Sequence, residues 1–311
     1  MGITGQISMD TGLGLWVRQL GCIAIGVLLA SAAAAADILL TATEDSPVVQ
    51  AFVSDLAQRR LQDSVHFVVT DKLAAPGTIP EETRLILLDP GSLDWRLLDS
   101  QGPATLVLRI SRIQAHQRLA EKRPPNLSLL WSDPPVSRQL KLIRQLLPQA
   151  REVGVLFDSD SQFLLKELRH AAAPMGLKIV SQPWRPAANN RPLDWLINRS
   201  DVLLGLDDNQ LYNARTAKNL LLSSYARQLA LLGPNAGFVK AGSLASTYSD
   251  QVDWLDTLDA LLNASPASWP RAMYPRHFKV VSNPRVARSL GIAPINDSAV
   301  TASLADAERQ P

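Results

Sequence analysis

Several polar residues of this sequence stand directly after short apolar runs, where a buried β-strand would end. The two groups that contain acids are Ser132 and Asp133 after the run 127–131, and Asp207, Asp208 and Asn209 after the run 202–206, with Tyr212 about one helical turn later. Carboxylates and amides form hydrogen bonds and a tyrosine can stack, which is what recognition of a polar small molecule requires. Each group also fits a simpler interpretation, a helix cap alone for Asp133 and a helix cap with a surface tyrosine for the second group, and the sequence leaves both open.

Other predicted strand ends carry further candidate ligand-binding residues. These are Thr43, Asp45, Ser46, Asn235, Tyr248 and Ser249. Ser46 precedes Pro47, a pair that equally predicts a plain helix N-cap with proline at the first helical position.

The sequence offers little for catalysis, metal binding or cofactor binding. The four histidines are scattered singly, and neither a nucleophile elbow nor a glycine-rich phosphate loop is present. We therefore expect no metal, no cofactor and no enzyme. A hydrolase that uses Asp207 or Asp208 as an acid or base is the last-ranked alternative. The 31 basic and 29 acidic residues nearly cancel, and no dense basic tract would follow a phosphate backbone, so nucleic acid is not an expected partner.

The elements that would position these residues alternate between strand and helix. The run 126–158 has an apolar strand, a polar Ser-Asp-Pro-Pro turn, an amphipathic helix and a second apolar strand, which together make one βαβ unit. Similar apolar runs recur along the chain and indicate strands buried on both faces of parallel sheets. With 311 residues, of which 46% are hydrophobic, the sequence predicts two Rossmann-like α/β lobes.

The expected domain boundaries follow this rhythm. They are a signal peptide at 1–36, an N-terminal lobe at 37–125, a C-terminal lobe at 126–234, segments that cross back to complete both lobes at 235–292, and a disordered tail at 293–311. The tail is polar and shows no periodicity.

The N-terminal segment 16–36 has Arg18 before an apolar run that ends in alanines, and Ala34 and Ala36 suit cleavage before Asp37. We expect export by a cleaved signal peptide to the periplasm, with an uncleaved anchor as the alternative and Met9 as a second possible start. The single cysteine, Cys22, would be removed with this segment, so the mature chain would hold no disulfide.

Four ordered segments resemble the substrate-binding proteins of ABC transporters, specifically an uncharacterised subgroup related to aromatic amino-acid binders. They are NLSLLWSDPPVSRQLKLIRQLLPQAREVGVLFD at 126–158, DVLLGLDDNQ at 201–210, FVKAGSLASTYS at 238–249 and VVSNPRVARSLGI at 280–292. The resemblance implies a type I periplasmic binding fold, with three crossovers forming a hinge. It favours Ser132, Asp133, Asp208, Asn209 and Tyr248 as residues that face the cleft between the lobes.

The chain also departs from the family pattern. Leu127, Ser128 and Leu129 stand where the family has Ile-Thr-Gly, which removes a glycine that permits close ligand approach. The N-terminal lobe matches poorly.

The resulting hypothesis is a monomeric periplasmic solute-binding component that captures a small molecule and delivers it to an inner-membrane ABC permease or an envelope receptor complex. The alternative is a ligand-free interaction module of such a complex.

Overall fold

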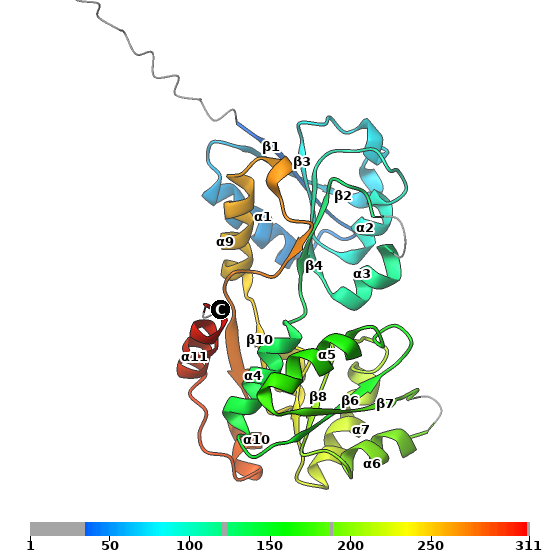
Figure 1. Cartoon of the computed structure of the whole chain (residues 1–311). Coiled ribbons are helices and arrows are strands. Elements are labelled where there is room, and N and C mark those ends of the chain that lie inside the picture. Colours follow the sequence, from blue (N-terminus) through cyan, green and yellow to red (C-terminus); the bar gives the residue numbers. More distant parts are fainter. Residues whose placement is uncertain (1–34, 120–122, 187–188, 310–311) are drawn as a thin grey trace, which may run out of the picture. The chain divides into compact units, whose positions relative to one another are not determined.

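The computed structural model describes residues 35–119, 123–186 and 189–309, and the predicted signal segment lies almost entirely outside them. The stretch Ala35–Pro311 forms one compact unit. It contains two six-stranded sheets with interleaved helices (Figure 1). The predicted fold class, two α/β lobes built on mainly parallel sheets, is confirmed.

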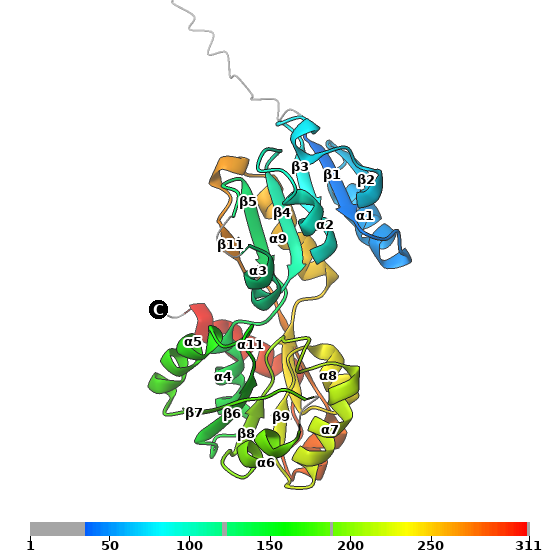
Figure 2. The ribbon, with the colours of Figure 1, turned by 90° about the vertical axis from the view of Figure 1, so that its right-hand side faces the viewer.

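The first sheet has the strand order β11-β5-β4-β3-β1-β2, and all its pairs are parallel. Its strands are β1 (Asp37–Ala42), β2 (Ser64–Val69), β3 (Arg84–Leu87), β4 (Thr105–Ile110), β5 (Leu127–Trp131) and β11 (Ala272–Met273). Its helices are α1 (Pro47–Arg59), α2 (Pro90–Arg96), α3 (Arg112–Leu119) and α9 (Gln251–Leu262). One face of the sheet packs with α1 and α9 and the other with α2 and α3 (Figure 2), so its strands need apolar residues on both sides.

The second sheet has the order β12-β10-β9-β8-β6-β7, with β12 antiparallel to β10. Its strands are β6 (Glu152–Phe157), β7 (Lys178–Pro183), β8 (Val202–Leu204), β9 (Ala230–Leu232), β10 (Ala245–Tyr248) and β12 (Lys279–Ser282). Its helices are α4 (Val136–Leu146), α5 (Leu164–Ala172), α6 (Arg191–Ile197), α7 (Ala214–Tyr225), α8 (Ala236–Ala241), α10 (Pro284–Ser289) and α11 (Asp297–Arg309). Two apolar clusters cover its faces. Short 3-10 turns occur at 70–72, 76–78, 173–175 and 266–268.

The chain passes between the two sheets three times, after β5, after β10 and after β11. This arrangement corrects one expected boundary. The strand Leu127–Trp131 was expected to open the second lobe, but β5 pairs in parallel with β4 in the first sheet. The first crossover therefore begins at Ser132. An apolar strand is equally suited to either sheet, and its pairing depends on residues far away in the sequence.

The expected disordered tail is also wrong. Residues Asp297–Arg309 form α11, which lies beside α4 and β12 (Figure 1). Val300 and Leu304 are spaced by one helical turn and are 7% and 2% exposed, so together they bury one face of this helix. Glu308 accepts two hydrogen bonds from Arg138 of α4, at 2.7 and 2.9 Å. Tertiary contacts thus stabilise this helix, which its polar sequence did not predict.

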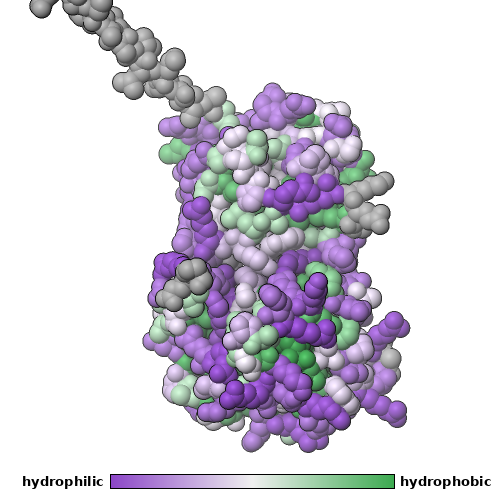
Figure 3. Space-filling model, in the orientation of Figure 1, coloured by the Kyte–Doolittle hydropathy of each residue, from purple (hydrophilic) through white to green (hydrophobic). Residues whose placement is uncertain are grey.

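The surface in Figure 3 is largely hydrophilic, with apolar areas of limited size. The large apolar side chains that the described residues expose are spread over different helices and turns: Val48, Leu61, Leu98, Phe163, Trp195, Leu222 and Val252. None of the described helices is both long enough and apolar enough to cross a bilayer.

Candidate functional site

The carboxyl end of β8 and the first crossover bring two predicted acids, Asp133 and Asp207, to one small cavity. Arg112, at the start of α3 in the first lobe, lines the same cavity, which measures about 20 Å³. This volume is enough for about one water molecule. Strand ends of this kind are where α/β proteins bind ligands, and here the protein's own side chains fill the place.

Asp133 is 7% exposed and its carboxylate binds Arg112. Oδ1 accepts the backbone N–H of Arg112 at 2.8 Å, and Oδ2 accepts Nε at 2.9 Å. Burial raises the pKa of Asp133, and the guanidinium opposes that rise. Asp133 does not cap α4, the helix that follows it, because the N-cap of α4 is Pro135 and no side chain caps this helix. The expected cap on the following helix is therefore wrong, and Asp133 instead accepts the first backbone N–H of α3.

Asp207 is half-buried at the end of β8 and accepts a hydrogen bond from Asn235 Nδ2 at 3.3 Å. Burial, with the negative charge of Asp133 as the second cause, raises the pKa of Asp207 to about 6. Asn235 also caps α8 by accepting the backbone N–H of Phe238. Gly205 lets β8 approach β9 here, because a Cβ on it would lie 2.7 Å from Pro234 Cδ. Two predicted residues from neighbouring strand ends thus meet.

The other predicted residues after β8 serve local structure. Asp208 is 1% exposed, and its Oδ1 accepts the backbone N–H groups of Gln210 and Leu211, which closes a turn. Tyr212 is 6% exposed and packs edge-on against Phe238, with ring centroids 5.7 Å apart. Burial raises its pKa. Asn209 is exposed. The structure therefore places Tyr212 in the core instead of on the surface, and it turns Asp208 away from solvent.

In the first lobe, Thr43 binds Asp89, which caps α2. Asp45 accepts a hydrogen bond from Gln50 Nε2, and Ser46 caps α1 as its N-cap interpretation expects. These three predicted residues lie at the carboxyl end of β1 in the first sheet. Asp207, in contrast, follows β8 in the second sheet.

The remaining candidates lie on the crossovers. The backbone N–H of Ser132 donates to Ile110 O at 2.9 Å. Tyr248 is the half-buried last residue of β10, and Ser249 donates to the carbonyl of His277 at 2.8 Å, which joins the second and third crossovers. Ser132 and Ser249 thus have structural partners.

The residues that link α3 to the second lobe were missed. Arg112 Nη1 donates to Glu167 Oε2 of α5 at 2.6 Å, Gln117 donates to Asp160 at 2.6 Å, and the ring of His116 stacks on Phe163 at 4.4 Å. Arg112 follows the strand β4 by two residues, a position like that of the predicted acids, so its place after an apolar run was the signal that could have found it.

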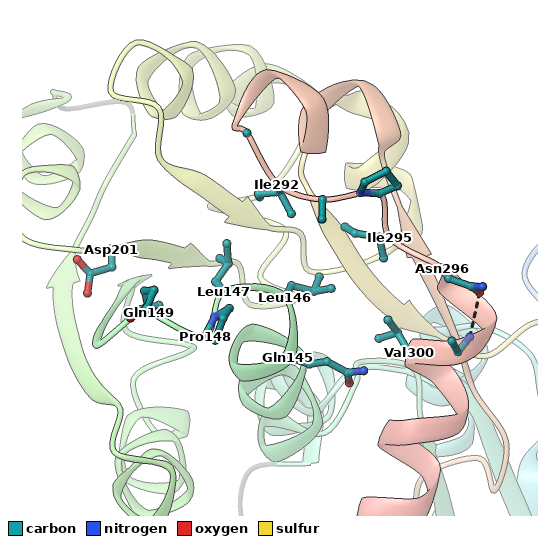
Figure 4. Close-up of a pocket in the computed structure, with 15 residues that line it drawn as sticks. Gln145, Leu146, Leu147, Pro148, Gln149, Asp201, Ile292, Ile295, Asn296 and Val300 are labelled. Carbon is teal, nitrogen blue, oxygen red and sulfur yellow. Dashed lines mark hydrogen bonds between the residues drawn. The ribbon is translucent and has the colours of Figure 1, made fainter.

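A larger pocket, of about 760 Å³, lies at the opposite end of the second sheet (Figure 4). Apolar side chains such as Leu146 and Ile292 line it. Its acid, Asp201, already accepts the backbone N–H groups of Arg151 and Glu152. This pocket lies at the amino ends of β6 and β8, away from the predicted residues. Within the described ranges, no three His, Cys, Asp or Glu side chains converge to hold a metal ion.

No protein-family model matches this sequence, and no curated protein is significantly similar to it. Solved structures are similar in fold. A substrate-binding protein with adhesive properties from Clostridium difficile, in its ligand-free, open form, superposes with a TM-score of 0.64 at 17% identity, covering 84% of this chain and 96% of that one. An ABC domain in complex with L-Trp from Streptococcus pneumonia gives 0.57 at 17% identity, covering 83% and 95%.

A conserved domain protein from Vibrio cholerae gives a TM-score of 0.58 at 18% identity, covering 86% of this chain and 97% of that one. These identities are low, so the likeness concerns the fold. Together with the two six-stranded sheets and the three crossovers, it shows that the chain has the type I periplasmic binding-protein fold.

Proposed function

We propose that this protein binds a small polar solute at the carboxyl ends of the parallel strands in its two sheets. The observation that carries this proposal is that three charged side chains, the buried Asp133 and the half-buried Arg112 and Asp207, surround one cavity. Burying charged groups is costly, so such groups mark places where a protein needs them. A carboxyl group with a pKa of about 6 accepts or donates a hydrogen bond near neutral pH, which suits Asp207 to hold a polar group of the solute.

Arg112 would have to move for a solute to reach this place. It ties α3 of the first lobe to Asp133 in the crossover and to Glu167 in the second lobe. Capture would proceed through a state in which these contacts are broken, and the lobes would close again on the solute, as in hinge motions of two-lobe binding proteins. In the cell, the loaded protein would deliver its solute to an ABC permease of the inner membrane after export to the periplasm.

Equilibrium dialysis tests the proposal. The purified chain is dialysed against a defined mixture of amino acids including L-tryptophan, sugars, dicarboxylates and nucleosides, and mass spectrometry measures which compounds accumulate with the protein. We expect one chemical class to accumulate, and Asp207→Asn to reduce its accumulation at least tenfold. Asp201→Asn is the matched control because it removes an acid at the amino end of the same strand. No accumulation, or accumulation that Asp207→Asn leaves unchanged, contradicts the proposal.

The second candidate is a ligand-free interaction module, which the small size of the cavity favours. In that case no solute accumulates, while the chain captures a membrane partner from an envelope extract whether or not solutes are present.

A further inference from the structure

Arg109 has a backbone conformation that few side chains adopt. It lies in β4 with φ of 57°, and the pairing register of β4 with β5 shifts between Val107 and Ile110. Before the shift, Leu106 and Leu108 face the α1 and α9 cluster, while Val107 faces the α2 and α3 cluster. A residue other than glycine or asparagine is strained in the left-handed region, and strained residues of this kind cluster at functional sites.

The register shift changes the face that Arg109 occupies. Strict alternation would put residue 109 on the same face as Val107. Instead Ile110 takes its place in the α2 and α3 cluster, and the guanidinium of Arg109 lies 5.1 Å from the ring centre of Phe52 in α1. The irregular backbone thus presents a cation beside α1 near the carboxyl end of a central strand, in the first lobe.

The residue Arg109 is half-buried, and its side chain has no hydrogen-bond or ion-pair partner in the part of the chain that the structure describes. Other buried arginines are paired: Arg96 donates to Thr105, Asn126 and the carbonyl of Asp99, and Arg138 binds Glu308 through two nitrogens. Burial lowers the pKa of Arg109, which reflects the cost of holding its charge there.

Asp89, the acid at the end of the neighbouring strand β3, does not form an ion pair with Arg109. Asp89 follows β3, which pairs with β4, and its two oxygens accept hydrogen bonds from Thr43 and Ser92. The other residue with a positive φ that is not glycine, Gln228, has an ordinary explanation, since it follows the last turn of α7 where left-handed caps are common. Arg109 does not follow a helix, and its positive φ lies at the register shift of β4.

We propose that Arg109 binds an anionic group of the solute, a carboxylate or a phosphate ester, from the first lobe. The planar guanidinium matches both anions with paired hydrogen bonds. The inference rests on the proposed solute binding and adds the chemical class of the solute. The anion would supply the acceptors that the protein withholds from Arg109.

Thermal melting with matched probe pairs tests this inference on the purified chain. The pairs are succinate with succinamide, L-tryptophan with L-tryptophanamide, and glycerol 3-phosphate with glycerol. We expect one anion to raise the melting temperature by roughly 5 °C at a hundredfold excess over its Kd, and its partner without the anionic group to have no effect. The pair that responds also distinguishes a carboxylate from a phosphate.

Two glycine variants provide the comparison. Arg109→Gly should melt no lower than the wild type without probe, because it removes backbone strain and a cation that has no hydrogen-bond or ion-pair partner, and it should lose the response to the anion. Gln228→Gly relieves the same kind of strain elsewhere and should keep the response. Arg109→Lys, which keeps the charge without the planar fork, should keep part of it.

The inference is overturned if the compounds without the anionic group stabilise as well as the anions, if Arg109→Gly keeps the response, or if this variant without probe melts well below the wild type. It is also overturned if no probe acts while dialysis finds a bound solute, and the proposed function then stands. If dialysis finds no solute either, both fail.

Discussion

Replacing Asp207 by asparagine should stabilise the protein in a manner that depends on pH. In the folded chain, burial and the charge of Asp133 raise the pKa of Asp207 from 3.8 to about 6. The unfolded chain loses this proton near pH 3.8, so between about pH 4 and pH 6 the folded state holds more protons. The free energy of unfolding therefore falls as the pH rises through this range. Asparagine cannot ionise, so the variant avoids this fall in the free energy of unfolding.

The magnitude follows from the two pKa values. Each tenfold change in proton affinity is worth about 1.4 kcal/mol, so the ionised Asp207 costs at most about 3 kcal/mol of stability above pH 7. Asp207→Asn should raise the free energy of unfolding by about 2–3 kcal/mol at pH 8 and by about 0.5 kcal/mol at pH 4. Asparagine also retains an oxygen for the hydrogen bond from Asn235 Nδ2.

Urea unfolding followed by tryptophan fluorescence, repeated at intervals from pH 4 to pH 8, measures this difference. Asp201→Asn, at the other end of β8, controls for the loss of one negative charge. The reasoning is refuted if Asp207→Asn is no more stable than the wild type at pH 8, or if its advantage is the same at pH 4.

Three further substitutions test other parts of the structure. Glu167→Gln should weaken the tie between α5 and Arg112 by about 0.3–1 kcal/mol, because Glu167 is half exposed, and should increase the solute association rate up to about fivefold in stopped-flow fluorescence. Gly205→Ala should lower stability in urea by about 1–3 kcal/mol and weaken solute binding, since the new Cβ meets Pro234. Leu304→Ala should lower stability by about 2–4 kcal/mol, whereas removal of a disordered tail residue would have no effect.

The sequence was sufficient to predict the α/β architecture, because strands buried on both faces need apolar residues at nearly every position. The run 153–157 meets this requirement clearly. The strand Ala272–Met273 was missed because two residues carry no periodicity. Helix α11 left only the pair Val300 and Leu304 as a signal, and its contact with Arg138 joins residues 170 positions apart.

Only those residues of the candidate site whose placement follows from standing directly after a strand could be predicted. Asp133 and Asp207 follow strands, so their placement at a carboxyl edge follows from the βα rhythm. The partner of Asp133, Arg112, lies 21 residues earlier at the start of α3, and no local pattern connects the two. Tyr212 shows the opposite case, since helical spacing alone cannot distinguish a core tyrosine from a surface one.

Hydrogen–deuterium exchange with and without the solute found by dialysis tests the central claim most directly. The account predicts that the bound solute slows exchange at strand ends of both lobes, in the segments 108–112 and 204–210. Protection confined to 145–150 and 291–300, which line the larger pocket at the far end of the second sheet, would contradict it.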